Sequence, residues 1–382
     1  LHAFHPSPDE QQQTECQQVV QDLAERVKRI AGESGSLEVI GSWRMGVPTP
    51  ASDLDLVALL PAPVEHESFI ESMVTSLESD AEDLLVTRNA RVPRLSFRIR
   101  DFKVDLLTAT VEDEESWQIV RAISETDHVL EFAQQAMPLE TFHRLLRSVR
   151  AWAHARGIHG NAWGFLGGFP WAVLTAWSSL QLLAGQRPNR ESSVLELLTH
   201  FFQVISQHPW PSPVSLIPNR YQAQGPRNRL PILRPVEPLE NCAYNITRST
   251  EEILRAEWAR GASIFEQEKS TEHALCRLFE PAGVCHGSEE VLRISLHGSE
   301  ENLNDFCGQF EGRVVGLLID FERELHLRAR PWPSMIKSEK AWQILIGLPL
   351  LRKCDREAAQ LTISNLLSEL NSTGVSWSLQ WE

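Results

Sequence analysis

Three aspartates and a Gly-Ser pair form a pattern that is typical of metal-dependent chemistry. Ten residues separate Gly41-Ser42 from Asp53-Leu54-Asp55, and Asp105 follows 50 residues after Asp55. Because side chains alternate along a strand, the carboxylates of Asp53 and Asp55 project from the same face. With Asp105 on a neighbouring strand, they form a set of the hard oxygen ligands that Mg²⁺ prefers. The pattern predicts a cage for two ions, one to activate an attacking hydroxyl and one to steady a triphosphate leaving group.

The position of Asp105 within an apolar strand favours this interpretation. A carboxylate in such a place is costly to bury unless a cation pairs with it. Two acids spaced like Asp53 and Asp55 are more often solvated side chains, but the third acid and the preceding Gly-Ser make that alternative weak. Gly41 allows the backbone to approach a phosphate closely, and Ser42 at the start of a helix can donate to phosphate oxygens.

Hydrophobic periodicity divides the chain into three predicted domains with an α+β fold class. Residues 1–116 are predicted to form a small α/β domain, whose first helix, over 9–30, either belongs to it or packs with the next domain. Residues 117–270 are predicted to be mainly helical. Residues 271–382 show the order strand, helix, strand, strand, helix, strand, which is typical of a ferredoxin-like domain.

Local patterns predict the individual elements. The Pro-rich segment 207–249 is expected to be irregular, a helix to begin near Ser249 with a hydroxyl cap, and the tryptophans of 152–177 to lie in a core. The segments 94–100 and 102–107 form either one bent strand or a hairpin. Strands are further expected over 37–40, 53–60, 291–296, 315–321, 325–328, 341–348 and 375–381, and helices over 68–77, 302–314 and 356–370.

The composition of the 382 residues is that of a globular protein, with 42% hydrophobic and 23% charged residues. The net charge of −15 argues against a chain that grips nucleic acid by its overall charge. That charge is uneven, with −12 over residues 1–115 and +5 over residues 141–270. No apolar run predicts a membrane span. Six cysteines without a CxxC pair favour reduced thiols in an intracellular protein, nuclear or cytoplasmic.

The segment 41–55, GSWRMGVPTPASDLD, resembles the signature of the DNA polymerase β-type nucleotidyltransferases, and more narrowly that of the eukaryotic-type poly(A) polymerases. Residues 146–161 resemble the helix before that family's glycine loop, and residues 164–174 resemble the loop and the helix after it. The C-terminal domain resembles the family's RRM-like domain more weakly. Shorter similar segments follow in the family's order at 210–214, 230–235 and 244–247.

This resemblance implies a three-domain enzyme that transfers AMP from ATP to the 3′-hydroxyl of RNA, with Mg²⁺ or Mn²⁺ bound and pyrophosphate released. Asp53, Asp55 and Asp105 match the family's three metal-binding aspartates. Ser42, beside Gly41, matches its triphosphate-contacting serine. The metal side of the family pattern is therefore complete in this chain.

The nucleotide side of the pattern departs from the family. Gly167, Gly168 and Phe169 fall where the family's loop packs on the adenine, with Phe169 in place of a small aliphatic residue. Arg150 stands where the family has a nucleotide-contacting Lys, and His159 where it has a Tyr. Arginine keeps a cation for phosphate but presents it as a planar fork. These five residues are the predicted nucleotide contacts of the central domain.

The family's Leu-Asn-Gly segment, which helps to hold the nucleotide, has no clear counterpart here. The nearest stretch is 121–125, and Arg121 is its predicted substitute. Nucleotidyl transfer is thus better supported than the choice of ATP or of RNA. Two alternatives stay open: the same chemistry on a small-molecule, nucleotide or protein acceptor, and a non-catalytic scaffold that retains the fold. Because the overall charge is negative, an RNA acceptor must be held locally or delivered by a partner protein.

Overall fold

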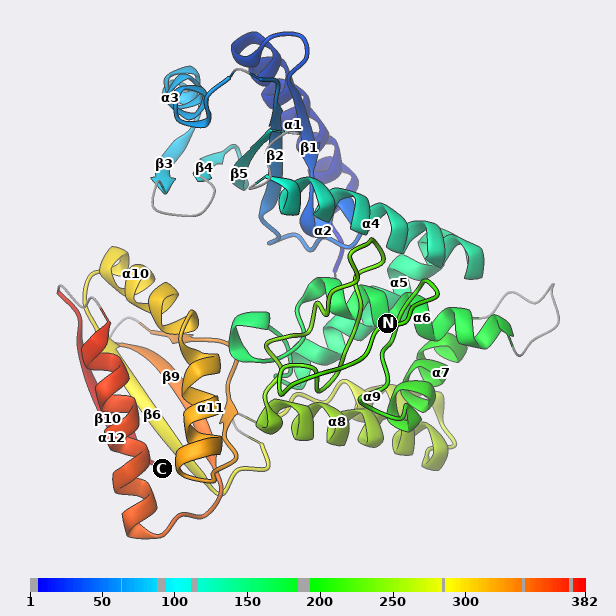
Figure 1. Ribbon diagram of the computed structural model, residues 1–382, viewed down its shortest axis with the longest axis vertical. Helices are drawn as coiled ribbons and strands as arrows, with labels where there is room; N and C mark the ends of the chain where they lie inside the picture. Colours follow the sequence, from blue (N-terminus) through cyan, green and yellow to red (C-terminus); the bar gives the residue numbers. More distant parts are fainter. Residues whose placement is uncertain are drawn as a thin grey trace. The chain divides into compact units, whose positions relative to one another are not determined.

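The fold class predicted from the sequence, α+β, is confirmed by two five-stranded sheets and the helices around them (Figure 1). The chain folds as two compact units, Leu1–Arg147 with Pro235–Pro238, and Ser148–Arg234 with Leu239–Glu382. The boundary falls within helix α5 (Leu139–Ala155). The structure is a computed structural model, and it describes residues 6–62, 64–87, 94–110, 116–184, 193–283, 286–338, 341–370 and 374–382.

The sheet of the first unit has the strand order β1-β2-β5-β4-β3. β2 and β5 run parallel, and the other neighbouring strands run antiparallel. β4 and β5 form a hairpin that turns at Arg100, which has a φ of 52°, so the alternative of one bent strand is excluded. The strands are Ser36–Val39 (β1), Leu54–Leu60 (β2), Glu82–Thr87 (β3), Arg94–Ile99 (β4) and Phe102–Thr110 (β5).

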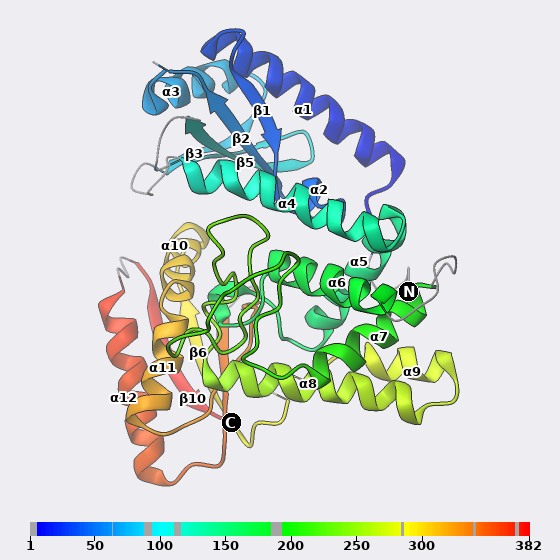
Figure 2. The ribbon, with the colours of Figure 1, turned by 45° about the vertical axis from the view of Figure 1, so that its right-hand side comes forward.

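Two helices cover one face of this sheet and form its core. α1 buries Val19, Leu23 and Val27 at helical spacing, and α3 adds its own apolar residues to the same cluster. Alternate residues of β2 and β5, such as Leu56 and Leu106, point into this core. The intervening residues of the two strands therefore face the other side, where α4 contacts β5 (Figure 2). The helices of this unit are Glu10–Ala31 (α1), Gly41–Arg44 (α2), His66–Leu77 (α3) and Trp117–Ala136 (α4).

The second unit contains the predicted helical region. Trp152 and Trp171 are fully buried and meet edge to face with 5.8 Å between ring centroids, which confirms them as core residues. Residues 208–247 are irregular, as predicted. α8 begins at Arg248, and its hydroxyl cap is Thr247 instead of Ser249. The helices are Asn161–Trp163 (the 3₁₀ helix η2), Gly168–Ala184 (α6), Val194–Gln207 (α7), Arg248–Gln267 (α8) and Thr271–Leu278 (α9).

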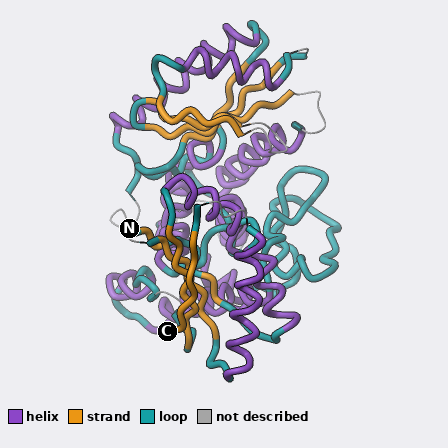
Figure 3. The backbone as a smooth tube through the Cα atoms, turned by 90° about the vertical axis from the view of Figure 1, so that its left-hand side faces the viewer, coloured by secondary structure: helices purple, strands orange, loops and turns teal. Residues whose placement is uncertain are grey.

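The sheet of the second unit is antiparallel, with the order β10-β6-β9-β7 and a short β8 beside β9. The helices α10, α11 and α12 lie over one of its faces (Figure 1), seen from the side as purple tube beside the orange strands in Figure 3. The strands are Glu290–His297 (β6), Arg330–Pro331 (β7), Ile336–Lys337 (β8), Trp342–Leu348 (β9) and Ser376–Trp381 (β10), and the helices are Glu300–Glu311 (α10), Val314–Glu324 (α11) and Lys353–Glu369 (α12).

Two predicted strands of this region are wrong. Residues 315–321 belong to α11, in which Val314, Leu317, Leu318 and Phe321 are buried at helical spacing. The local run of branched apolar residues favours a strand, but packing against the sheet selects the helix. Residues 325–328 form a loop, and the strand pairing with β9 starts only at Arg330.

Cys16, Cys242, Cys276, Cys307 and Cys354 are free thiols. Cys285 lies outside the residues that the structure describes. Across those described residues, no helix combines the length and the apolar content that crossing a bilayer would require.

Candidate active site

Asp55 and Asp105 are paired in register on the parallel strands β2 and β5. Asp53 directly precedes β2, and the two strands bring all three predicted aspartates together on the face opposite the core. Burial and then the negative charges of Asp105 and Asp53 raise the pKa of Asp55, which lies at about 6. The three carboxylates therefore repel one another, which a bound cation would relieve.

Three side chains beyond the predicted set balance part of this negative charge. Lys103 Nζ lies 2.8 Å from Asp53 Oδ2. The Ser96 hydroxyl donates to Asp105 Oδ1, and Arg94 Nη1 lies 3.9 Å from Asp105 Oδ2. A sequence signal for Lys103 exists, because it is two residues before Asp105 on β5, and the alternation that exposes the aspartate exposes the lysine too.

The three carboxylates offer oxygen ligands to a metal ion. Within the described ranges, no three His, Cys, Asp or Glu side chains converge closely enough to hold a metal as they stand. The donor chemistry nevertheless fits a hard divalent cation, because it consists of carboxylate oxygens with a mutual repulsion to relieve. The side chains of Lys103 and Arg94, which pair with the aspartates, are 52% and 45% exposed. They can therefore move away from the carboxylates without disturbing the hydrophobic core.

Gly41 begins the short helix α2 and lies close to the Asp55 carboxylate. Its φ is +65°, and a Cβ atom built on it would lie 2.3 Å from Asp55 Oδ2. The backbone amide of Ile40 donates to the Asp55 carbonyl at 2.9 Å. Glycine is thus needed here for close approach to a carboxylate, a constraint beyond the predicted approach to phosphate. Ser42, the next residue, lies in the single turn of α2.

Arg44 fixes this turn to the rest of the first unit. Its Nε and Nη2 atoms donate to the two carboxylate oxygens of Asp127 on α4 at 2.8 and 2.7 Å. Its Nη1 atom donates to Glu38 at 2.9 Å and to the Val39 carbonyl at 3.1 Å. A bidentate pair of this kind holds geometry as well as charge, so Arg44 positions the Gly-Ser turn.

Arg121 lies in the interior of the first unit. It forms an ion pair of 2.7 Å with Glu125, and both side chains are almost fully buried. Its Nη2 atom donates to the carbonyls of Val236 and Pro238 at 2.9 and 2.6 Å. The guanidinium therefore holds residues 235–238 in this unit. Its nucleotide contact stays a prediction, and one that would require these bonds to break.

The second unit brings Arg150 and His159 together. The His159 ring stacks on His154 with 3.7 Å between centroids and 23° between planes. Burial lowers the pKa of His159, a hydrogen bond with the Ala153 backbone opposes this effect, and the charge of Arg150 adds to it, so that the pKa lies at about 4. His159 is therefore a neutral ring at pH 7, able to donate from one nitrogen and accept at the other.

The predicted glycine loop leads back to this histidine. His159 and Leu166 form a parallel bridge, which places Gly167 and the start of α6 near the His159 backbone. Gly168 is the first residue of α6, and a Cβ atom on it would meet no atom within 4 Å. The Phe169 ring lies 5.8 Å from the guanidinium carbon of Arg234. The predicted residues thus fall in both units. The first unit holds Asp53, Asp55 and Asp105 (the aspartate set), together with Gly41, Ser42 and Arg121. The second unit holds the predicted nucleotide contacts of the central domain (the nucleotide set), which are Arg150, His159, Gly167, Gly168 and Phe169.

Known proteins share this arrangement of segments. Residues 141–281 match the family model described as "Poly(A) polymerase central domain". Nuclear poly(A) polymerase 3 of Arabidopsis thaliana is 30% identical over 307 residues, which are 74% of this chain and 58% of that protein. Poly(A) polymerase of Dictyostelium discoideum is 26% identical over 379 residues, which are 86% and 45%. The resemblance to eukaryotic-type poly(A) polymerases is confirmed. The chain spans about half the length of the curated relatives it matches.

Solved structures also share the fold of this chain. One is described as "Structural Plasticity of Cid1 Provides a Basis for its RNA Terminal Uridylyl Transferase Activity", with a TM-score of 0.58, 17% identity and coverage of 73% of this chain and 95% of that one. Another is a cytoplasmic RNA terminal U-transferase, with a TM-score of 0.57, 17% identity and coverage of 72% and 95%. At this identity the similarity concerns the fold alone.

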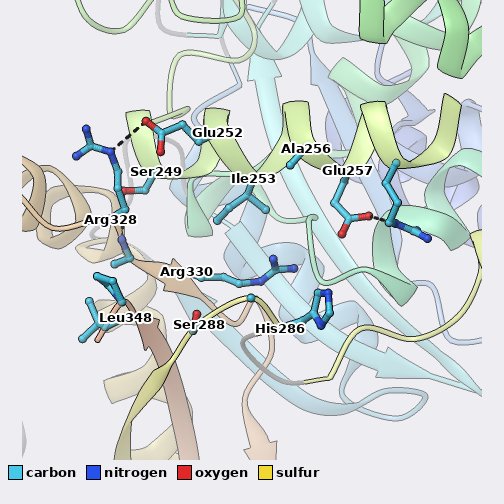
Figure 4. A pocket seen from close by; sticks show the side chains of 14 residues that line it. Ser249, Glu252, Ile253, Ala256, Glu257, His286, Ser288, Arg328, Arg330 and Leu348 are labelled. Carbon is cyan, nitrogen blue, oxygen red and sulfur yellow. Dashed lines mark hydrogen bonds and ion pairs between the residues drawn. The ribbon is translucent and has the colours of Figure 1, made fainter. Parts of the chain in front are cut away.

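A cavity of about 500 Å³ in the second unit of this chain is separate from the predicted nucleotide set (Figure 4). It lies under α8, between that helix, β7 and the end of β9. Two of its arginines are paired with α8 carboxylates, Arg328 with Glu252 at 3.1 Å and Arg260 with Glu257 at 2.8 Å. The Arg328 pair joins α8 to the loop before β7, and the Arg260 pair lies within α8. Both ion pairs give the cavity wall a structural role.

Proposed function

We propose that this chain is a metal-dependent, template-independent nucleotidyltransferase of the poly(A) polymerase type. It transfers NMP, with AMP the first choice, from NTP to the 3′-hydroxyl of RNA and releases pyrophosphate. The observation that carries the proposal is the register of Asp55 against Asp105, with Asp53 two residues away, in a chain whose relatives are named poly(A) polymerases.

The aspartate set would hold Mg²⁺ or Mn²⁺, and two ions are the sequence-based prediction. When bound, such an ion supplies Lewis-acid chemistry that favours the attacking alkoxide and the departing pyrophosphate. Asp53, Asp55 and Asp105 would hold the ions once Lys103 leaves Asp53. Ser42 would donate to the triphosphate from the turn that Arg44 fixes.

The nucleotide set would bind the base, ribose and phosphates. Arg150 supplies a permanent positive charge, and His159 supplies a neutral ring with a hydrogen-bonding edge, which its lowered pKa supports. Gly167 and Gly168 leave room at the start of α6, where Phe169 offers a ring face. These roles extend the family resemblance to this chain as part of the proposal.

The finer architecture belongs to the same proposal. The division into 1–116, 117–270 and 271–382, with an RRM-like last domain, is supported by the strand order β10-β6-β9-β7 and by the helices over one face of that sheet. An intracellular location is supported by relatives that carry "nuclear" in their names.

The test is primer extension by the purified protein. A 5′-labelled oligo(A) RNA is incubated with each NTP separately, with Mg²⁺ and with Mn²⁺, and we expect a product ladder with ATP. Asp105→Ala should lower the rate by at least about 10³-fold, while Asp101→Ala, an exposed acid in the β4–β5 turn, should leave it unchanged. A folded protein that extends no RNA with any NTP would overturn the proposal.

A second candidate changes only the acceptor. It is favoured by the net charge of −12 over residues 1–115, which repels a polyanion unless the RNA is held locally or delivered by a partner protein. Incubation with labelled ATP and a metabolite or protein mixture, followed by mass spectrometry, would detect a nucleotide-tagged product. Asp105-dependent release of pyrophosphate without RNA would establish this candidate.

A further inference from the structure

A cavity of about 610 Å³ lies in the first unit, on the side of the Gly-Ser turn that α1 and α5 cover. It belongs neither to the aspartate set nor to the nucleotide set. Its size is that of a pocket for a small organic molecule. Its walls combine apolar groups with several nitrogen atoms, and they include Pro8, Cys16, Val20, Ala24, Val39, Trp43, Gly46, Pro48, His143 and Arg147.

Three nitrogen atoms in this wall are buried and have no hydrogen-bond partner among the described residues. They are Trp43 Nε1, His143 Nε2 and Arg147 Nε. Their side chains meet around Gly46: Arg147 Nη2 donates to the Gly46 carbonyl at 2.7 Å, and a Cβ atom on Gly46 would lie 2.4 Å from the His143 ring. Trp Nε1 and Arg Nε can only donate, so side chains of the cavity wall carry donors that lack an acceptor among the described residues.

The charge of Arg147 points to an anionic acceptor. The guanidinium is partly buried, and within the described part of the chain it makes no ion pair; burial lowers its pKa. The neighbouring His143 cannot balance it, because an imidazole is never an anion; burial, and then the charge of Arg147, lower the pKa of that ring and favour its neutral form. A desolvated cation without a counter-ion is unfavourable. Arg44, the other guanidinium of the wall, is already paired with Asp127 and Glu38.

We propose that this cavity binds a small organic anion. Its carboxylate or phosphate accepts hydrogen bonds from Trp43 and Arg147, and from His143 in the tautomer that protonates Nε2. Its apolar body lies against Val20 and Val39. A charge-assisted hydrogen bond is stronger than a neutral one, so the anionic group supplies most of the selectivity.

Occupancy of the cavity also bears on the proposed active site, and this step rests on the proposed function. Trp43 lies directly between Ser42 and Arg44, the residue that anchors α2. An anion that draws Trp43 and Arg147 together therefore tightens this turn. The ligand therefore regulates nucleotidyl transfer without touching the reacting atoms.

Binding is tested with three matched probes and ligand-detected NMR on the purified chain. 1-Naphthylacetate and 1-naphthyl phosphate are the two anions, and 1-naphthylacetamide is the neutral control. We expect at least one anion to bind 10-fold or more tightly than the amide. Arg147→Gln should weaken that anion at least 10-fold and leave the amide unchanged, and Trp43→Phe should weaken it 3-fold or more. Arg29→Gln, an exposed arginine of α1 outside the cavity, is the control.

The outcomes separate this inference from the proposed function. The proposed anion site would be overturned if the anions and the amide bind equally. It would also be overturned if Arg147→Gln keeps the melting temperature of the wild type and binds the anion equally well. Absence of binding at millimolar probe would do the same. Asp105→Ala should still bind the anion, so a chain without transferase activity can pass this test. If the two anions differ, the tighter one shows whether the acceptor is a carboxylate or a phosphate.

Discussion

Asp55 and Asp105 lie opposite each other in the register of two parallel strands, and their negative charges repel each other. Burial and then the charge of Asp105 raise the pKa of Asp55 to about 6. A carboxyl that is easier to protonate in the folded state than in the unfolded state favours folding at low pH. This contribution of Asp55 to the free energy of unfolding is lost as the pH rises from about 4 through 6. The site is thus destabilised at neutral pH until a cation binds.

Replacement of Asp105 by Asn is expected to stabilise the metal-free protein while it abolishes transfer. Removing one negative charge lowers the pKa of Asp55 toward its ordinary value, so the free energy of unfolding at pH 8 should rise by about 1 kcal/mol. Urea denaturation in EDTA measures this change, with Asp101→Asn as the control. A lower stability at pH 8 would contradict the assigned repulsion.

Gly41→Ala should damage both folding and activity. The added Cβ would lie 2.3 Å from Asp55 Oδ2, and the φ of +65° is strained for alanine, so we expect a loss of about 1–3 kcal/mol and a fall in kcat. Gly308→Ala on α10 is the matched control, because a Cβ there meets no atom within 4 Å. Thermal unfolding and primer extension measure the two effects, and a variant as stable and active as Gly308→Ala would refute the close approach.

His159→Tyr should change the pH dependence of stability. Because the folded-state pKa of His159 is lowered to about 4, the unfolded chain binds a proton more readily, and stability falls as the pH drops from about 6.5 to 4. The variant should lose on the order of 2 kcal/mol of this dependence, measured by urea denaturation across that range. The KM for NTP should change at most a few-fold, since a ring with a hydrogen-bonding edge is retained. An unchanged pH profile would contradict a buried neutral histidine.

Glu257→Gln should destabilise the second unit without changing the rate of nucleotidyl transfer by the folded protein. Glu257 accepts two hydrogen bonds of 3.0 Å from Arg156 and one of 2.8 Å from Arg260. Burial opposes ionisation, but these bonds outweigh it and hold the pKa of Glu257 below its ordinary value. We expect a loss of about 3 kcal/mol at pH 7, which diminishes as the pH falls through that pKa. Glu266→Gln, exposed on the same helix, should be neutral; an equal loss there would indicate a general effect of charge.

Much of the aspartate set was accessible from the sequence because strand alternation is a local property. The same-face placement of Asp53 and Asp55 needed only the period of two, and their proximity to Asp105 follows from two adjacent strands. The contacts of Asp105 with Arg94 and Ser96 on β4 could be predicted only from the hairpin register, which places Ser96 opposite Asp105. No local signal distinguished that register from a bent strand.

Elements whose stability comes from tertiary packing were the ones that sequence patterns missed. β3 is an edge strand with largely exposed side chains, so its sequence shows no alternation. α9 is only eight residues long and follows α8 after a short break. In α11 the local preference and the final packing disagree. The role of Arg121 was hidden for a similar reason, because its acceptors lie 115 and 117 residues later in the chain.

That long separation sets an order of events during protein synthesis. When the ribosome has released the first 147 residues, the acceptors of Arg121 at Val236 and Pro238 do not yet exist. A nascent first unit must either keep this guanidinium in water or bury it with part of its hydrogen bonding missing. The N-terminal unit therefore reaches its final form only after residue 238 has emerged, when part of the second unit has already been synthesised.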